Sequence, residues 1–180
     1  TISGNSLDVN HYGIQTDSGN DLDISDNDIT GFDEYGILFN STYSSNIFDN
    51  TLVSTPNNDS NNYGIYNSSS SYGNTVYNNN IHILDAYDTV EGIRASNVDL
   101  QGNTIIIENG GGSNYGIRGE NNTIFNNNIT INASSSSYAI YNNTTYSSRA
   151  IYSNQIELSG GASGIKGNQL HIHDNDITGS

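Results

Sequence analysis

Three of the four basic residues in this chain stand at matching positions, each directly after an isoleucine. Arg94, Arg118 and Lys166 follow Gly-Ile pairs, and Tyr141 follows the equivalent Ala-Ile pair. If the fold stacks these positions in one column, the cations and the tyrosine could grip an anionic sugar chain, with arginine binding carboxylates bidentately. The alternative is local charge balance, because several acids are close in sequence: Glu91, Glu120, Asp88 and Asp99.

Clustered acids offer a second kind of chemistry, the binding of a cation. Carboxylates at alternate positions could hold Ca²⁺, and such a cluster is formed by Asp21, Asp23, Asp26 and Asp28. The EF-hand spacing with its distal glutamate is absent, so a solvated acidic edge is the favoured interpretation.

A histidine pair near the end of the chain is a third candidate. His171 and His173 flank Ile172 and share one strand face, where Asp174 could help them to bind a transition metal. With no third imidazole and no thiolate beside them, we expect exposed polar residues and no resident metal or cofactor.

The element that must position these residues is a repeat with one asparagine per turn of the chain. The pattern is apolar, any, small or polar, Asn, any, apolar, with spacings of 21 to 29 residues. Its asparagines are Asn5, Asn27, Asn50, Asn79, Asn103, Asn127, Asn154 and Asn175. A sharp turn between short strands explains this residue, because Asn tolerates the left-handed conformation and its amide can bond to the Asn above and below.

A Tyr-Gly-Ile motif alternates with the asparagine turns, first at Tyr12-Gly13-Ile14. Each coil therefore has three short apolar segments in period-2 alternation, which indicates strands. Such strands bury an apolar face only by stacking on equivalent strands of the neighbouring coils. The sequence predicts an all-β, right-handed, single-stranded parallel β-helix of about eight coils, with three parallel sheets and an Asn ladder at one tight turn, as one domain over residues 1–180.

These motifs resemble the parallel β-helix repeat of the pectate-lyase-like superfamily over the whole chain. In character the chain is most similar to adhesin-like cell-surface β-helix proteins of archaea and bacteria. In enzymes of the superfamily, the resemblance places the cleft on the outer face of the Gly-Ile sheet. Lyase chemistry there needs Ca²⁺-binding acids beside a base, and hydrolysis needs a carboxylate pair. The outward column after each isoleucine contains no acid, so we expect no catalytic residue and no enzyme activity.

A stripe of aromatic residues should lie outside the strand that precedes each Asn turn. It contains Phe48, Tyr77, Phe125 and Tyr152. Such a stripe favours self-association, with sugar stacking or simple stacking between coils as the alternatives.

Glycosylation sequons occur in the loops and strands. The proposed acceptors are Asn40, Asn58, Asn67, Asn132 and Asn142. The chain starts and stops at Asn turns without a cap, so we expect a segment of a longer β-helical protein, with end-to-end stacking of copies as the second hypothesis.

Composition excludes several classes of function. The formal charge is −15 with only 4 Lys and Arg, so no basic field exists to attract nucleic acid. There are no cysteines and no apolar run long enough to span a membrane. We expect a structural, non-catalytic element of an extracellular cell-surface filament, sheath or adhesin, with a β-helix that binds or cleaves an acidic polysaccharide as the alternative.

Overall fold

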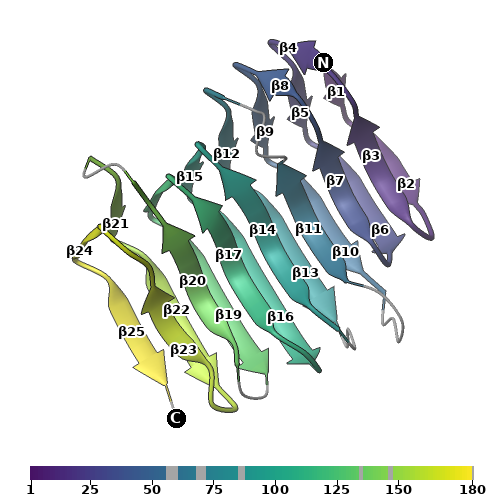
Figure 1. The fold of residues 1–180 in the computed structure, drawn as a ribbon. Helices are drawn as coiled ribbons and strands as arrows, with labels where there is room; N and C mark the ends of the chain where they lie inside the picture. The colour runs from purple at the N-terminus through teal and green to yellow at the C-terminus, as the bar shows by residue number, and fades with distance from the viewer. Residues whose placement is uncertain (56–60, 68–71, 85–87, 134–135, 146–147, 180) are drawn as a thin grey trace.

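The computed structural model describes residues 1–55, 61–67, 72–84, 88–133, 136–145 and 148–179, and these residues form a parallel β-helix. Successive coils stack into a rod with the two termini at opposite ends (Figure 1). The described residues contain strands and turns but no helix. None of the described segments forms a helix that could cross a membrane.

Three parallel sheets make up the walls; in the described residues seven coils contribute one strand to each wall, and the last coil contributes strands to sheets A and B only. Sheet A consists of β1 (Ile2–Ser3), β5 (Asp23–Ser25), β9 (Asn46–Phe48), β12 (Thr75–Tyr77), β15 (Asp99–Gln101), β18 (Thr123–Phe125), β21 (Ala150–Tyr152) and β24 (His171–His173). Sheet B consists of β2 (Ser6–Asp8), β6 (Asp28–Phe32), β10 (Thr51–Ser54), β13 (Asn80–Leu84), β16 (Thr104–Gly110), β19 (Asn128–Ala133), β22 (Gln155–Ser159) and β25 (Asp176–Gly179).

Sheet C has seven strands: β3 (Tyr12–Thr16), β7 (Tyr35–Phe39), β11 (Asn62–Asn67), β14 (Val90–Ser96), β17 (Asn114–Glu120), β20 (Tyr138–Asn143) and β23 (Ser163–Lys166). A short side pair joins β4 (Gly19–Asn20) to β8 (Thr42–Tyr43). The predicted architecture of about eight coils and three sheets is confirmed.

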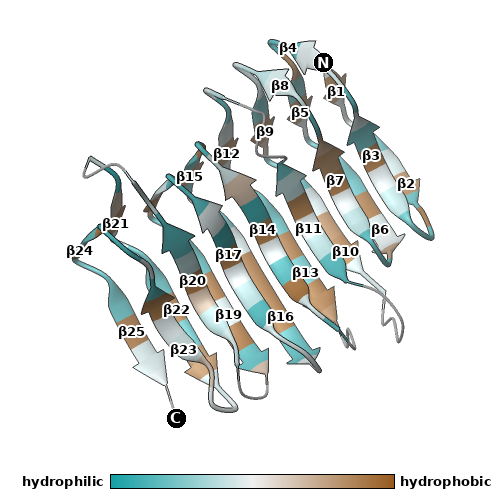
Figure 2. Ribbon diagram, viewed as in Figure 1, coloured by the Kyte–Doolittle hydropathy of each residue, from teal (hydrophilic) through white to brown (hydrophobic). Residues whose placement is uncertain are grey.

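The interior is a continuous column of branched aliphatic side chains. Equivalent isoleucines pair in register from coil to coil, as Ile81 with Ile105 and Ile105 with Ile129, and all three are 0% exposed. Figure 2 shows the result as hydrophobic bands that run across neighbouring strands of the rod. Each coil therefore buries its apolar face only against its neighbours, which is the stacking that the repeat requires.

The asparagine ladder runs through the turn between sheets A and B. Each ladder Nδ2 donates to the Oδ1 of the next ladder asparagine at 2.8 to 3.0 Å, without interruption from Asn5 to Asn175. Backbone N–H groups of the ladder residues donate to the same oxygens, as from Asn79 to Asn103 at 3.1 Å. The six ladder asparagines between the two ends are at most 1% exposed, so this ladder is internal as predicted.

The left-handed residue of this turn is not the one expected from the sequence. The left-handed conformation is adopted by the residue before each ladder asparagine, not by the asparagine itself, with φ of 54° to 68°. These residues are Gly4, Asp26, Asp49, Asn78, Gly102, Asn126, Ser153 and Asp174. The small or polar position of the repeat thus supplies the backbone turn, and the asparagine supplies hydrogen bonds.

A second corner, between sheets C and A, also has a left-handed residue followed by an inward residue, but no single residue type marks it in the sequence. Residues with φ of 51° to 67° precede it at Asp21, Ser44, Gly73, Asn97, Asn121 and Gln169. The following residues point inward, and there the Ser45 N–H donates to Asn74 Oδ1 at 2.9 Å and the Val98 N–H to Asn122 Oδ1 at 3.0 Å. Apolar residues such as Leu22 and Val98 interrupt the polar residues of this column, so it is a broken second ladder.

Candidate functional site

The basic residues singled out from the sequence lie together on the outer face of sheet C. Strand pairing places one column in register: Gln15, Leu38, Tyr66, Arg94, Arg118, Tyr141 and Lys166. Arg94 and Arg118 are direct neighbours on β14 and β17, and their side chains are 38% and 35% exposed. The fold therefore brings the predicted stripe together as one surface.

A buried glutamate lies beneath the two arginines. Glu91 Oε1 accepts from Arg118 Nη1 at 2.9 Å and from Arg94 Nη1 at 3.4 Å, and the glutamate side chain is 0% exposed. Burial raises the pKa of Glu91 above its ordinary value, and the two guanidinium groups offset only part of that rise. Local ion pairing is thus present, but two cations share one carboxylate.

Glu91 occupies a place where five of the other six strands of sheet C have tyrosine and the last has Ser163. Its backbone pairs with Tyr63 on one side and Tyr115 on the other. Rings stack along this column on both sides of the glutamate, at 4.9 Å between Tyr35 and Tyr63 and 6.0 Å between Tyr115 and Tyr138. Glu91 therefore interrupts an outer tyrosine ladder, and among the described residues its buried Oε2 atom has no hydrogen-bond partner.

The cations of the column also lie over tyrosine rings. Arg94 Cζ is 5.3 Å from the centre of the Tyr66 ring, and Arg118 Cζ is 4.6 Å from that of Tyr115. Lys166 Nζ is 4.8 Å from the centre of the Tyr138 ring. Such cation–π contacts hold the long side chains against the sheet.

An open groove of about 490 Å³ lies over this part of sheet C. It is lined by Tyr66, Asn67, Arg94, Ser96, Arg118, Gly119, Glu120, Tyr141 and Asn143. Asn67 is 3% exposed and pairs in register with the core residue Phe39, and among the described residues neither of its buried side-chain amide atoms has a hydrogen-bond partner. The half-exposed guanidinium groups of Arg94 and Arg118 are the groups that make this groove a candidate binding site.

The predicted aromatic stripe lies on the outer face of sheet A. Phe48 stacks on Tyr77 at 4.9 Å, and Phe125 stacks on Tyr152 at 5.1 Å. The stacking between coils that was an alternative for this stripe is therefore present, and Tyr152 extends it to His173 at 5.2 Å.

The proposed metal ligands are spread over separate positions. Asp21 and Asp26 are exposed turn residues, Asp28 begins β6, and Asp23 accepts from Asn46 Nδ2 at 2.9 Å. His171 and His173 are exposed on β24, where His173 Nδ1 lies 2.8 Å from Asp174 Oδ2. Over the ranges that the structure describes, no three His, Asp or Glu side chains gather closely enough to hold a metal.

The proposed glycan acceptors differ in exposure. Asn132 is exposed and Asn40 is half-buried, so the folded rod has space for a glycan at these two positions. Asn142 and Asn67 are 0% and 3% exposed, and neither has such space. Asn58 lies outside the described residues.

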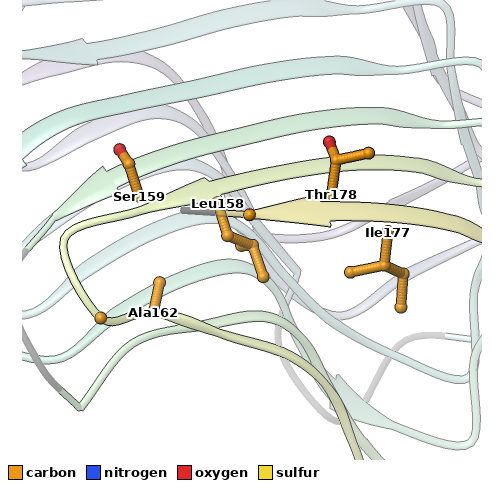
Figure 3. Close-up of a pocket in the computed structure, with 7 residues that line it drawn as sticks. Leu158, Ser159, Ala162, Ile177 and Thr178 are labelled. Atoms are coloured by element: carbon orange, nitrogen blue, oxygen red, sulfur yellow. The ribbon is translucent and has the colours of Figure 1, made fainter.

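A smaller cavity of about 280 Å³ lies at the last coil. Figure 3 shows Leu158 and Ile177 pointing to one side of β22 and β25, and Ser159 and Thr178 pointing to the opposite side. The apolar side of this cavity thus continues the interior of the rod.

Comparisons with known proteins agree with this fold. A family model described as "Periplasmic copper-binding protein (NosD)" matches residues 1–89, and no curated protein matches the chain. A point mutant of the periplasmic alginate epimerase AlgG is similar in structure, with a TM-score of 0.56 and 16% identity over 93% of this chain and 48% of that one. A double mutant of AlgG gives a TM-score of 0.52 and 14% identity over 98% of this chain and 51% of that one.

At such identities the similarity concerns the fold alone, and the chain spans about half the length of these structures. The match nevertheless covers nearly all of this chain, and it agrees with the register of the three sheets and with the Asn ladder. The chain is therefore a parallel β-helix repeat protein.

Proposed function

We propose that the chain is a structural, non-catalytic rod element of a cell-surface filament, sheath or adhesin. The observation that supports this most is the unbroken ladder from Asn5 to Asn175, which bonds every coil to the next inside the rod. Because the sheet hydrogen bonds also run along the rod axis, tension on the ends is shared by the walls and the ladder together. This is the mechanical arrangement that a load-bearing spacer needs.

A location outside the cytoplasm is part of this proposal. The matching family model and the similar epimerase structures are all described as periplasmic. The acidic, lysine-poor surface, with a charge of −15, suits a solvated exterior that repels nucleic acid and anionic lipid.

The test uses the natural full-length protein in its own cells. Antibodies against this segment should label intact cells, and electron microscopy of purified material should show rods or filaments. Incubation with uronate polymers should give no unsaturated or shortened products. Polymer cleavage, or labelling only after cell lysis, would contradict the structural proposal.

A second candidate function is the binding of an acidic polysaccharide in the groove on sheet C. It is favoured by Arg94 and Arg118, which share the single charge of Glu91 and so keep donor capacity for a carboxylate. Tyr66 and Tyr141 border the same groove and can pack against sugar rings. Glu120 at the lining opposes ligands that carry very dense negative charge.

This candidate is tested by electrophoresis through a gel that contains polyuronate. Arg118→Gln should abolish retardation, because it removes the guanidinium nearest to Glu91. The matched control is Arg149→Gln, which removes the same charge beside Asp99 on sheet A and should leave retardation unchanged. Equal effects of the two variants would indicate nonspecific charge binding, and unchanged retardation with Arg118→Gln would remove the hypothesis.

A further inference from the structure

Glu91 places an ionisable carboxyl group beneath the groove on sheet C. Its side chain is 0% exposed, and its Oε1 atom accepts from Arg118 Nη1 at 2.9 Å and from Arg94 Nη1 at 3.4 Å. Arg94 and Arg118 also line the groove, where their side chains are 38% and 35% exposed. Each guanidinium group is therefore bound to an internal carboxyl group and can still be reached by a ligand in the groove.

An anionic ligand in this groove must compete with Glu91 for the same two guanidinium groups. When Glu91 is ionised, its single negative charge opposes their two positive charges, and its Oε1 atom occupies donors that a ligand would use. When Glu91 is protonated, both positive charges act on the ligand. Charges that lie close together at a partly buried site interact strongly, so the protonation of this one carboxyl group should change the affinity for an anion.

The other titratable groups that lie around Glu91 are arginines and tyrosines. They are Arg94 on the same strand, Tyr63 and Tyr66 on β11, and Arg118 and Tyr115 on β17. Arginine and tyrosine side chains ordinarily change protonation only in alkaline solution. On the strands of sheet B that pack against β14, His82 and Glu108 pair with each other at 3.2 Å and are partly exposed. Among these groups, Glu91 is therefore the one whose charge can change beneath the groove in acid solution.

We propose that Glu91 couples anion binding in this groove to proton uptake, so that a polyuronate binds more tightly when the Glu91 carboxyl group is protonated. This inference rests on the polysaccharide binding proposed for the same groove, and it adds the control of that binding by pH. Burial raises the pKa of Glu91 above the ordinary 4.5, because desolvation disfavours the ionised form. The tight-binding form is therefore populated in mildly acid solution and is lost as pH rises through the raised pKa.

The experiment measures how tightly the whole chain and its Glu91→Gln variant bind a fluorescently labelled oligouronate, by fluorescence anisotropy at neutral pH and at pH 4.5. Glutamine has the size of glutamate without its charge. The ratio of the two dissociation constants cancels the effects of pH on the ligand and on shared groups, such as Glu120 in the lining of the groove. At neutral pH the variant should bind about tenfold more tightly, and at pH 4.5 the two proteins should differ by about twofold or less.

Glu157→Gln is the matched control, because it removes an exposed acid from sheet B and should bind as the natural chain does at both pH values. Glu91→Met, which is also uncharged and unbranched, repeats the measurement if the glutamine variant fails to fold. Binding that Arg118→Gln abolishes, but that gives the same ratio at both pH values, would overturn the control by Glu91 and leave the groove as a binding site. The absence of binding by every protein at both pH values would overturn the groove and this inference together.

Discussion

Removing one ladder amide from the middle of the rod gives the sharpest test of what holds the coils together. The Asn103 side chain is 0% exposed and takes part in four hydrogen bonds. Its Nδ2 donates to Val76 O at 2.9 Å and to Asn127 Oδ1 at 3.0 Å, and its Oδ1 accepts from Asn79 N at 3.1 Å and Asn79 Nδ2 at 3.0 Å. Asn103→Ala deletes all four without opening the coil to water.

The cost follows from which groups lose their partners. The Asn79 backbone N–H donates to Asn103 Oδ1 and loses that acceptor, and Val76 O loses a donor. Each buried polar group that is left unsatisfied costs about 1–3 kcal/mol, so Asn103→Ala should lower the free energy of unfolding by about 3–5 kcal/mol.

The matched control is the same substitution at the first coil. Asn5 is exposed, and Asn5→Ala loses only the Nδ2 donations to Ser3 O at 3.2 Å and Asn27 Oδ1 at 2.8 Å. Water can replace these bonds, so the expected loss is about 1 kcal/mol or less. Both variants are compared by urea unfolding, with hydrogen exchange at the Asn79 amide as the local measurement. Equal losses in the two variants, or an Asn79 amide that stays protected in Asn103→Ala, would refute this account of the ladder.

Three further predictions concern packing and pH. Gly92→Ala should destabilise by about 1–3 kcal/mol in urea unfolding, because the new Cβ would press on Ile105 Cγ2 and lie 2.6 Å from Gly116 O; Ala139→Gly, at the equivalent position of another coil, should cost less than about 1 kcal/mol. Because the pKa of Glu91 is raised in the folded protein, its contribution to the free energy of unfolding is fully present below pH 4.5 and is lost as pH rises through the folded-state pKa. In urea unfolding at a series of pH values, the stability of the natural chain relative to Glu91→Gln should therefore fall as pH rises. The pKa of Tyr35 is raised to about 12, first by burial and then by Tyr63 and Glu34. The free energy of unfolding should therefore fall as pH rises from 10.0 towards 12. A tyrosinate absorbance titration of Tyr35→Phe should lack the tyrosine that ionises last.

The architecture could be predicted from the sequence because every coil needs the same residue types at its tight turn and at its inward positions. Asn127 and Ile129, for example, face the same neighbours as Asn103 and Ile105, so the same residue types recur at nearly fixed spacing. The register of Arg94 and Arg118 follows from the same regularity, since a column position is fixed once the isoleucines are aligned. Their placement on one face therefore needed no knowledge of side-chain contacts.

Features that vary from coil to coil could not be predicted in the same way. The second corner has Ser45, Asn74, Val98 and Asn122 at one inward position, so no single residue type marks it. The sequon predicts Asn142 as a glycan acceptor, yet its Oδ1 accepts from the Asn122 N–H at 3.4 Å inside that corner. A sequon reports only local sequence, whereas burial depends on the coil that stacks above.

Glu91 was identified in the sequence only as a counter-ion, and its burial came from the structure. The available signal was its position, since an acid replaces the tyrosine of the Tyr-Gly-Ile motif in that coil alone. A charge that is fully buried needs partners, and two arginines one column away supply them. Departures from a repeat are therefore the places to look for function in such a chain.

Glu91 on sheet C and Gln101 on sheet A each interrupt an outer stack of aromatic rings, and a hollow lies at each break. A complete outer ladder covers its own ring faces and leaves a smooth, self-satisfied surface, as between Tyr12 and Tyr63. Where Glu91 replaces a tyrosine on β14, the groove with Arg94 and Arg118 lies beside it. Where Gln101 stands in place of a ring on the next strand, β15, a hollow lies beside Tyr77. Both hollows thus lie at breaks in an outer aromatic ladder in the middle of the rod. If the break on sheet C is filled by Glu91→Tyr, the proposed polyuronate binding at this face should disappear while the rod remains intact.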